Sequence, residues 1–85
     1  MHVTLISPER SLFDGDAGSL VAPAFDGLVG VLPGHAPFLT VLGSGTLTVS
    51  HDGRTSRFTV EGGMLQVLDD VVRVVAERAE PSAAA

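Results

Sequence analysis

Short apolar runs separated by glycine, proline and aspartate make up most of the chain. Runs rich in Val, Leu, Thr and Phe between turn-forming residues are typical of β-strands. The pattern predicts nine strands, at residues 2–7, 11–14, 18–23, 28–32, 37–42, 45–51, 54–61, 63–68 and 71–77. So many short strands in a small chain predict an antiparallel all-β fold, either a sandwich or a flattened barrel.

Two of the breaks predict hairpins whose register can be derived. If Asp52-Gly53 and Asp69-Asp70 are both two-residue turns, apolar residues on the paired strands fall opposite one another and share one face. The facing pairs are Leu47–Phe58 around the first turn, and Leu65–Val74 and Val67–Val72 around the second. Gln66 then lies opposite Arg73 on the other face.

Length and composition limit the possible functions. The 85 residues form one small domain, predicted as a β-sandwich over residues 1–78 and a flexible tail over residues 79–85. The net charge of −5, with no lysine, argues against nucleic acid and against adhesion to anionic lipid. No apolar run approaches the roughly 20 residues of a membrane-spanning helix, so we expect no direct lipid insertion. The first residues have no basic region, which argues against a secretory signal.

The histidines are the first candidates for chemistry. His2 and His51 are expected to be structural, since neither has the close histidine partner of a zinc site. His35 differs because Pro33 and Pro37 restrain its backbone. Its ring either hydrogen-bonds a nearby backbone carbonyl or anchors a protein interface, and both interpretations stay open at this point.

No catalytic, metal or cofactor site is predicted. The aspartates nearly all adjoin glycine or lie in breaks, including the Asp14-Gly15-Asp16 triplet, which favours a role in turns. No serine lies in a Gly-x-Ser-x-Gly elbow, and no phosphate-binding loop is possible without lysine. A pH-dependent activity that is abolished by mutating Asp26 or His35 would support an enzyme, but no residue spacing suggests one.

The run from Leu28 to Leu32 has four apolar side chains in five positions. It is either a central strand covered on both faces or an outward apolar strip, interrupted by Gly30, that a partner covers. In so small a domain the second interpretation is favoured. A stand-alone β-sandwich that binds a protein or peptide is one function consistent with it; a sugar platform is disfavoured without Trp or Tyr.

At this point the chain resembles a known family, the epsilon subunit of the bacterial F-type ATP synthase, in its N-terminal β-sandwich domain. The resemblance covers residues 2–80. Its motifs are Ser7-Pro8-Glu9-Arg10, Leu12-Phe13-Asp14-Gly15, Val21-Ala22-Pro23, the segment from Gly27 to Pro37, Val60-Glu61-Gly62-Gly63-Met64-Leu65-Gln66-Val67 and Val72-Arg73-Val74-Val75-Ala76.

The resemblance implies a non-catalytic rotor subunit in the central stalk, which links the gamma subunit to the membrane c-ring and couples ion translocation to ATP synthesis by rotation. With the strand pattern, it implies a flattened antiparallel β-sandwich of about nine to ten short strands. It also implies a peripheral location on the cytoplasmic face of the bacterial inner membrane, and no cofactor. The partner-binding residues it implies are Leu28, Val29, Gly30, Val31, Leu32, Pro33, Gly34, His35, Ala36 and Pro37.

Two departures from the family pattern matter. Leu28 stands where members often have an acidic residue that faces the c-ring, which implies an apolar contact here. The chain also lacks the C-terminal helical hairpin of the family. The inhibitory and ATP-binding roles of that hairpin are therefore expected to be absent if these residues are the whole protein.

Overall fold

The structure is a computed structural model that describes residues 1–82, and every regular element in that range is a β-strand. The confirmed all-β fold has eight strands. They are β1 (His2–Ile6), β2 (Ser11–Asp16), β3 (Ser19–Ala24), β4 (Gly27–Val31), β5 (Phe38–Val41), β6 (Ser44–His51), β7 (Arg54–Leu68) and β8 (Val71–Pro81).

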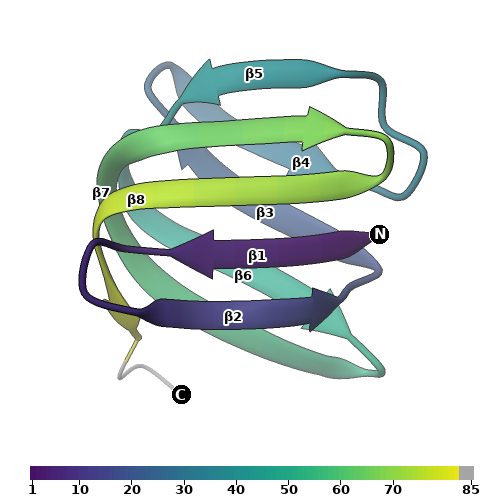
Figure 1. Ribbon diagram of the computed structural model, residues 1–85, viewed down its shortest axis with the longest axis horizontal. Coiled ribbons are helices and arrows are strands. Elements are labelled where there is room, and N and C mark those ends of the chain that lie inside the picture. The colour runs from purple at the N-terminus through teal and green to yellow at the C-terminus, as the bar shows by residue number, and fades with distance from the viewer. Residues whose placement is uncertain (83–85) are drawn as a thin grey trace.

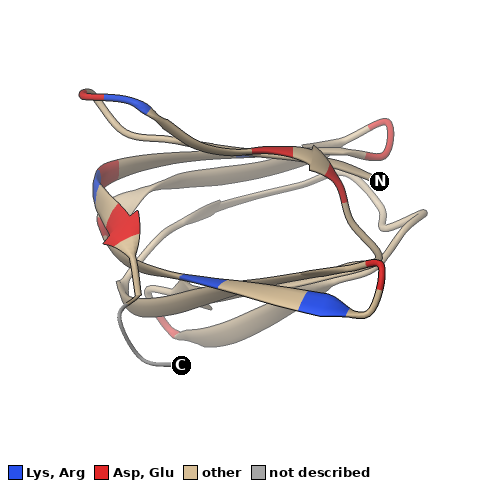
Figure 2. Ribbon diagram, turned by 90° about the horizontal axis from the view of Figure 1, so that it is seen from below, with Lys and Arg blue, Asp and Glu red and all other residues tan. Residues whose placement is uncertain are grey.

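The strands form one continuous sheet that folds over on itself into two layers (Figures 1 and 2). The strand order is β2-β1-β8-β7-β6-β3-β4, and β5 pairs with the other edge of β7. β7 and β8 are long enough to bend from one layer into the other (Figure 1). We call the layer of β2, β1, β5 and the adjoining halves of β7 and β8 the front layer, and the layer of β6, β3, β4 and the remaining halves the back layer.

Both predicted hairpin registers are confirmed. Leu47 pairs with Phe58 around the first turn, and Leu65 pairs with Val74 around the second. All four turn residues have positive φ, between 49° at Asp52 and 73° at Gly53. This is the backbone of a two-residue turn whose twist matches that of the flanking strands.

Three details of the prediction are wrong. Residues 54–61 and 63–68 belong to one strand, because β7 continues through Gly62-Gly63 rather than ending there. The sheet is not wholly antiparallel, since β1 pairs with β8 in parallel. β8 continues to Pro81, so the first residues of the predicted tail pair with β7; residues 83–85 of that tail lie outside the described residues.

The bend in β7 depends on glycine. Gly62 and Gly63 have φ of +64° and +118°, in the region that residues with a side chain rarely adopt. Pairing with β8 lapses at Gly62, and the Gly63 carbonyl accepts a hydrogen bond from the Leu42 N–H at 2.9 Å. The glycine pair that reads as a strand break in sequence therefore carries a single strand from one layer to the other.

Aliphatic side chains fill the space between the layers. Sixteen apolar residues are buried there, with no buried polar or charged residue among residues 1–82. The largest fully buried side chains are Leu5, Leu20, Leu47 and Leu65, two from each layer. Both sets alternate with outward-facing residues along their strands, as a two-layer sandwich requires. Core packing therefore does not restrict which residues occupy the two outer faces.

Candidate docking surface

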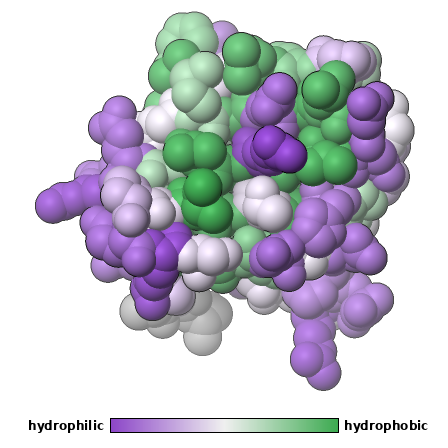
Figure 3. Space-filling model, viewed as in Figure 1, coloured by the Kyte–Doolittle hydropathy of each residue, from purple (hydrophilic) through white to green (hydrophobic). Residues whose placement is uncertain are grey.

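The outer face of the front layer carries a row of exposed apolar side chains. Ile6 of β1 pairs with Val75 of β8, Val75 pairs with Met64 of β7, and Met64 pairs with Val41 of β5. These four residues, which we call the apolar row, are each between 41% and 49% exposed. Figure 3 shows apolar residues gathered on this face of the molecule. A contiguous apolar surface on a small domain marks a site where another molecule binds.

The apolar surface extends beyond the row. Leu39 and Leu68 lie on the same face, two positions from Val41 in β5 and four positions from Met64 in β7, and are 62% and 46% exposed. At the β5 end, the Phe25 N–H donates a hydrogen bond to the Val41 carbonyl at 3.1 Å. Phe25, in the β3–β4 turn, is itself 71% exposed. The row therefore leads from the centre of the front layer to the β3–β4 hairpin.

The outer face of the back layer differs. Over β6 and β7 it is lined with hydroxyl-bearing residues and one arginine: Thr46, Thr48, Ser50, Thr55, Arg57 and Thr59. Exposed apolar side chains occur on it only along β3 and β4, at Val21 and Leu28, among the described residues. The outer face of the front layer is therefore apolar, whereas the outer face over β6 and β7 is polar.

The predicted partner-binding run forms β4 and the loop after it. Leu28 and Leu32 are 75% and 63% exposed, whereas Val31 is buried. β4 pairs with β3 on one side only, so it is an edge strand. The prediction of an outward apolar strip interrupted by Gly30 agrees with this geometry, and burial on both faces does not.

The loop of residues 32–37 holds His35 in a defined position. The His35 N–H donates to the Leu32 carbonyl at 3.1 Å, which closes a turn around Pro33 and Gly34. The ring Nδ1–H donates to the Ala36 carbonyl at 2.7 Å. The ring also packs edge-on against Phe38, with 5.8 Å between centroids. The backbone-carbonyl contact expected as one alternative is present, and the half-buried ring stays beside β5.

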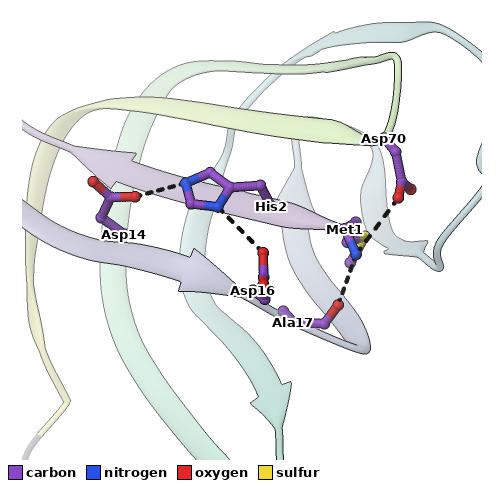
Figure 4. Close-up of polar contacts among 6 residues, drawn as sticks. All are labelled: Met1, His2, Asp14, Asp16, Ala17 and Asp70. Atoms are coloured by element: carbon purple, nitrogen blue, oxygen red, sulfur yellow. Dashed lines mark hydrogen bonds and ion pairs between the residues drawn. The ribbon is translucent and has the colours of Figure 1, made fainter.

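A polar cluster occupies the far edge of the front layer (Figure 4). His2 Nε2 lies 2.6 Å from Asp14 Oδ1, and His2 Nδ1 lies 3.3 Å from Asp16 Oδ1. The hydrogen bond to Asp14, followed by that to Asp16, raises the pKa of His2 above its ordinary value of 6.5. The prediction that Asp14-Gly15-Asp16 is a turn was wrong, because these residues extend β2 and both carboxylates face His2.

This cluster makes stability depend on pH. Both ring nitrogens of His2 can donate to the carboxylates only when the ring is protonated. Because folding raises the pKa, the stabilisation is complete below the unfolded value of 6.5 and is lost as the pH rises through the folded value. We expect the melting temperature to fall more between about pH 6 and about pH 9 in wild type than in His2→Gln. Equal slopes in thermal melts of both proteins would contradict this assignment.

A cleft of about 620 Å³ lies between the β1–β2 turn, the middle of β7 and the C-terminal end of β8. Charged residues line it, chiefly Glu9, Arg10, Glu61, Arg78 and Glu80, and it lies away from the apolar row. Across residues 1–82 no group of His, Asp and Glu side chains converges to hold a metal ion. The same range contains no helix with the length and apolarity needed to cross a membrane.

Sequence reasoning missed the apolar row. It used the inward residues of β7 and β8 to set the register and took Gln66 and Arg73 as representative of the outward face. The missed signal was Met64 and Val75, which place apolar side chains at outward positions of the same strands. The excess of apolar residues that drew attention to residues 28–32 is also present here.

The class of protein that the fold defines is a small two-layer β-sandwich domain with one apolar outer face. The family model of the ATP synthase Delta/Epsilon chain β-sandwich domain matches residues 1–82. The chain belongs to this family.

Individual relatives agree with this assignment. The chain is 42% identical to the ATP synthase epsilon chain of Maricaulis maris, over 93% of its own length and 59% of the relative's. It is 39% identical to the epsilon chain of Caulobacter vibrioides, over 98% of its own length and 96% of the relative's. A chain in the mitochondrial ATP synthase structure from Euglena gracilis, which contains OSCP, F1 and the c-ring, superimposes with a TM-score of 0.86 at 26% identity. That match covers 93% of this chain and 51% of the other. The chain thus spans about three fifths of the first of these relatives.

Proposed function

We propose that the chain is a non-catalytic rotor subunit in the central stalk of an F-type ATP synthase, which links the gamma subunit to the c-ring. In this role it couples ion translocation to ATP synthesis by turning with the rotor. Family membership supports the proposal, as does the resemblance to a chain in a complex that contains F1 and the c-ring. The observation that carries it is the apolar row, because a rotor subunit must present a permanent docking face.

The two apolar regions suit two partners. We assign the apolar row and the adjacent His35 loop to the gamma subunit, since together they offer a broad apolar face. We assign the exposed edge of β4, with Leu28, to the end of the stalk where the c-ring lies. Interfaces of permanent complexes commonly bury about 2,000 Å² or more and are apolar at their centres.

The architecture suits the transfer of torque. Strands hydrogen-bonded side by side resist shear, and β7 and β8 cross from one layer to the other without a break in the chain. Their pairing spans both layers, from Leu68–Val71 at one end to Phe58–Pro81 at the other. A force applied to the front layer therefore reaches the back layer through covalent and hydrogen-bonded strands rather than through a flexible linker.

The location follows from the partners. A subunit bound to the gamma subunit and the c-ring lies on the cytoplasmic face of the bacterial inner membrane, held there by protein contacts. It takes no part in the chemistry of ATP synthesis, which occurs on other subunits of the complex. No described residue of this chain is assigned a catalytic or cofactor-binding role.

Substitutions in the predicted binding run test the assignment. Leu28→Asp places a charge at an exposed apolar contact, and we expect it to lower incorporation with the c-ring by about tenfold or more. His35→Ala removes the ring that packs beside Phe38, and we expect it to weaken binding to the gamma subunit by about three- to tenfold. Both are measured by co-purification and titration with purified gamma and c-ring subunits.

Both variants should stay folded, because both side chains lie outside the core. Circular dichroism and thermal melting of the isolated chain provide that control. If both variants assembled with the gamma subunit and c-ring as wild type does, the partner-binding role of residues 28–37 would be wrong.

A further inference from the structure

We propose that Asp70 is a positioning residue for the loop of residues 32–37, which it holds in the conformation that binds the partner. The inference rests on the proposed function, because it takes this loop to be part of the interface with the gamma subunit. It concerns a residue 36 positions away from the loop in sequence, outside the segment predicted to bind.

The geometry that supports it is a single hydrogen bond. The Gly34 N–H donates to Asp70 Oδ1 at 2.9 Å. Within residues 1–82 this is the one hydrogen bond from residues 32–37 to a different element; the others close the loop on itself. Asp70 belongs to the β7–β8 turn, at the end of the strand that carries Met64. The bond therefore fixes the loop relative to the apolar row.

The loop needs such a contact. Pro33 and Pro37 stiffen it, but Gly34 between them adopts φ of +82° and has no side chain to pack. Proline lacks an N–H, so neither proline can donate a backbone hydrogen bond that would anchor the loop. The bond from Gly34 to Asp70 supplies the missing anchor one residue before His35. A hydrogen bond with an ionised acceptor is also stronger than a neutral one.

The position of Asp70 allows a test that separates positioning from folding. Asp70 has φ of +62° in a two-residue hairpin turn, where Asp-Gly is a favoured sequence. Asp70→Gly therefore removes the carboxylate without loss of the turn. Asp70→Asn keeps both an acceptor oxygen and tolerance for positive φ. Asp69→Asn is the matched control, since the Asp69 side chain forms no hydrogen bond or ion pair within residues 1–82.

The first measurement uses the isolated chain and NMR. In Asp70→Gly we expect the Gly34 amide to move upfield and to exchange with solvent about three- to tenfold faster, the effect of losing one charge-assisted bond at an exposed site. Asp70→Asn should restore most of the protection, and Asp69→Asn should match wild type. Asp70→Gly also removes the ion pair between Asp70 Oδ2 and the N-terminal ammonium, 3.6 Å apart, while glycine suits the positive φ of the turn. The melting temperature of Asp70→Gly should therefore stay within about 5 °C of wild type. An unchanged Gly34 amide in Asp70→Gly would overturn the inference.

The second measurement is the affinity for purified gamma subunit. A loop that occupies its binding conformation for less of the time lowers the apparent affinity in proportion, so Asp70→Gly should bind about three- to tenfold more weakly and Asp70→Asn should recover. If the Gly34 amide exchanges faster in Asp70→Gly but the gamma subunit binds all variants equally, the positioning role is wrong and the proposed function stands. If the wild-type chain itself does not bind the gamma subunit, the proposed function fails, and the interface role of the loop fails with it.

Discussion

Gly63→Ala is expected to lower the free energy of unfolding by about 3 kcal/mol or more. A Cβ at this position would lie 2.0 Å from the Val75 carbonyl oxygen and 2.8 Å from Ala76 Cα, both backbone atoms of the paired strand. Its φ of +118° adds backbone strain. Strain at such a position costs about 1–3 kcal/mol, and the clash adds to it, which is a large part of a stability of roughly 5–10 kcal/mol. Chemical denaturation followed by circular dichroism measures the loss.

Gly30→Ala is the matched control. It lies in a strand like Gly63, but nothing is within 4 Å of its added Cβ, and its φ is not positive. We expect its free energy of unfolding to stay within about 0.5 kcal/mol of wild type. If Gly63→Ala were as stable as Gly30→Ala, the bend of β7 between the layers would not depend on this residue, and the description of the fold would be wrong there.

Met64→Glu is expected to lower the affinity for the gamma subunit by about 100-fold, equivalent to about 2.7 kcal/mol. Met64 lies inside the apolar row, between Val41 and Val75. A carboxylate there would be buried without a partner when the complex forms, and loss of its hydration opposes binding. Isothermal titration calorimetry with purified gamma subunit measures the effect. The isolated variant should fold, because position 64 faces outward.

Thr55→Glu controls for the added charge. It lies on the same strand as Met64 but on the polar outer face of the back layer, opposite Ser50. The account predicts an affinity within about twofold of wild type, as expected for a position outside the interface. If Thr55→Glu bound more weakly than Met64→Glu, the gamma subunit would bind the back layer, and the assignment of the apolar row would be wrong.

The sequence predicted the fold well because the turn residues and the alternation of apolar and polar residues along the strands indicated the same registers. Turn chemistry at Asp52-Gly53 and Asp69-Asp70 fixed two registers, and alternation along the strands then fixed the inward faces. The Gly62-Gly63 pair was read as a strand end because glycine usually ends strands. Here its backbone freedom lets one strand bend, and only the three-dimensional path of β7 distinguishes the two outcomes. The parallel pairing of β1 with β8 is non-local and has no local signal.

The candidate site was predicted less completely. The run from Leu28 to Leu32 was found because its apolar excess is concentrated in one strand. The apolar row takes one residue from each of four strands, and its members become neighbours only through the sheet order. The hydrogen bond of Asp70 to Gly34 also joins segments far apart in sequence. Contacts of this kind depend on topology, which a single sequence does not supply.

Hydroxyl-radical footprinting of the side chains, with and without the gamma subunit, tests the central claim most directly. Met64 is the informative position, because methionine reacts readily and the side chain of Met1 is almost fully buried. If the apolar row is the docking face, saturating gamma subunit should slow the oxidation of Met64 by about fivefold or more, as at the desolvated centre of an interface, and leave Arg57 on the opposite face unchanged. Equal oxidation of Met64 in the free and bound chain, or protection confined to the Arg57 face, would contradict the account.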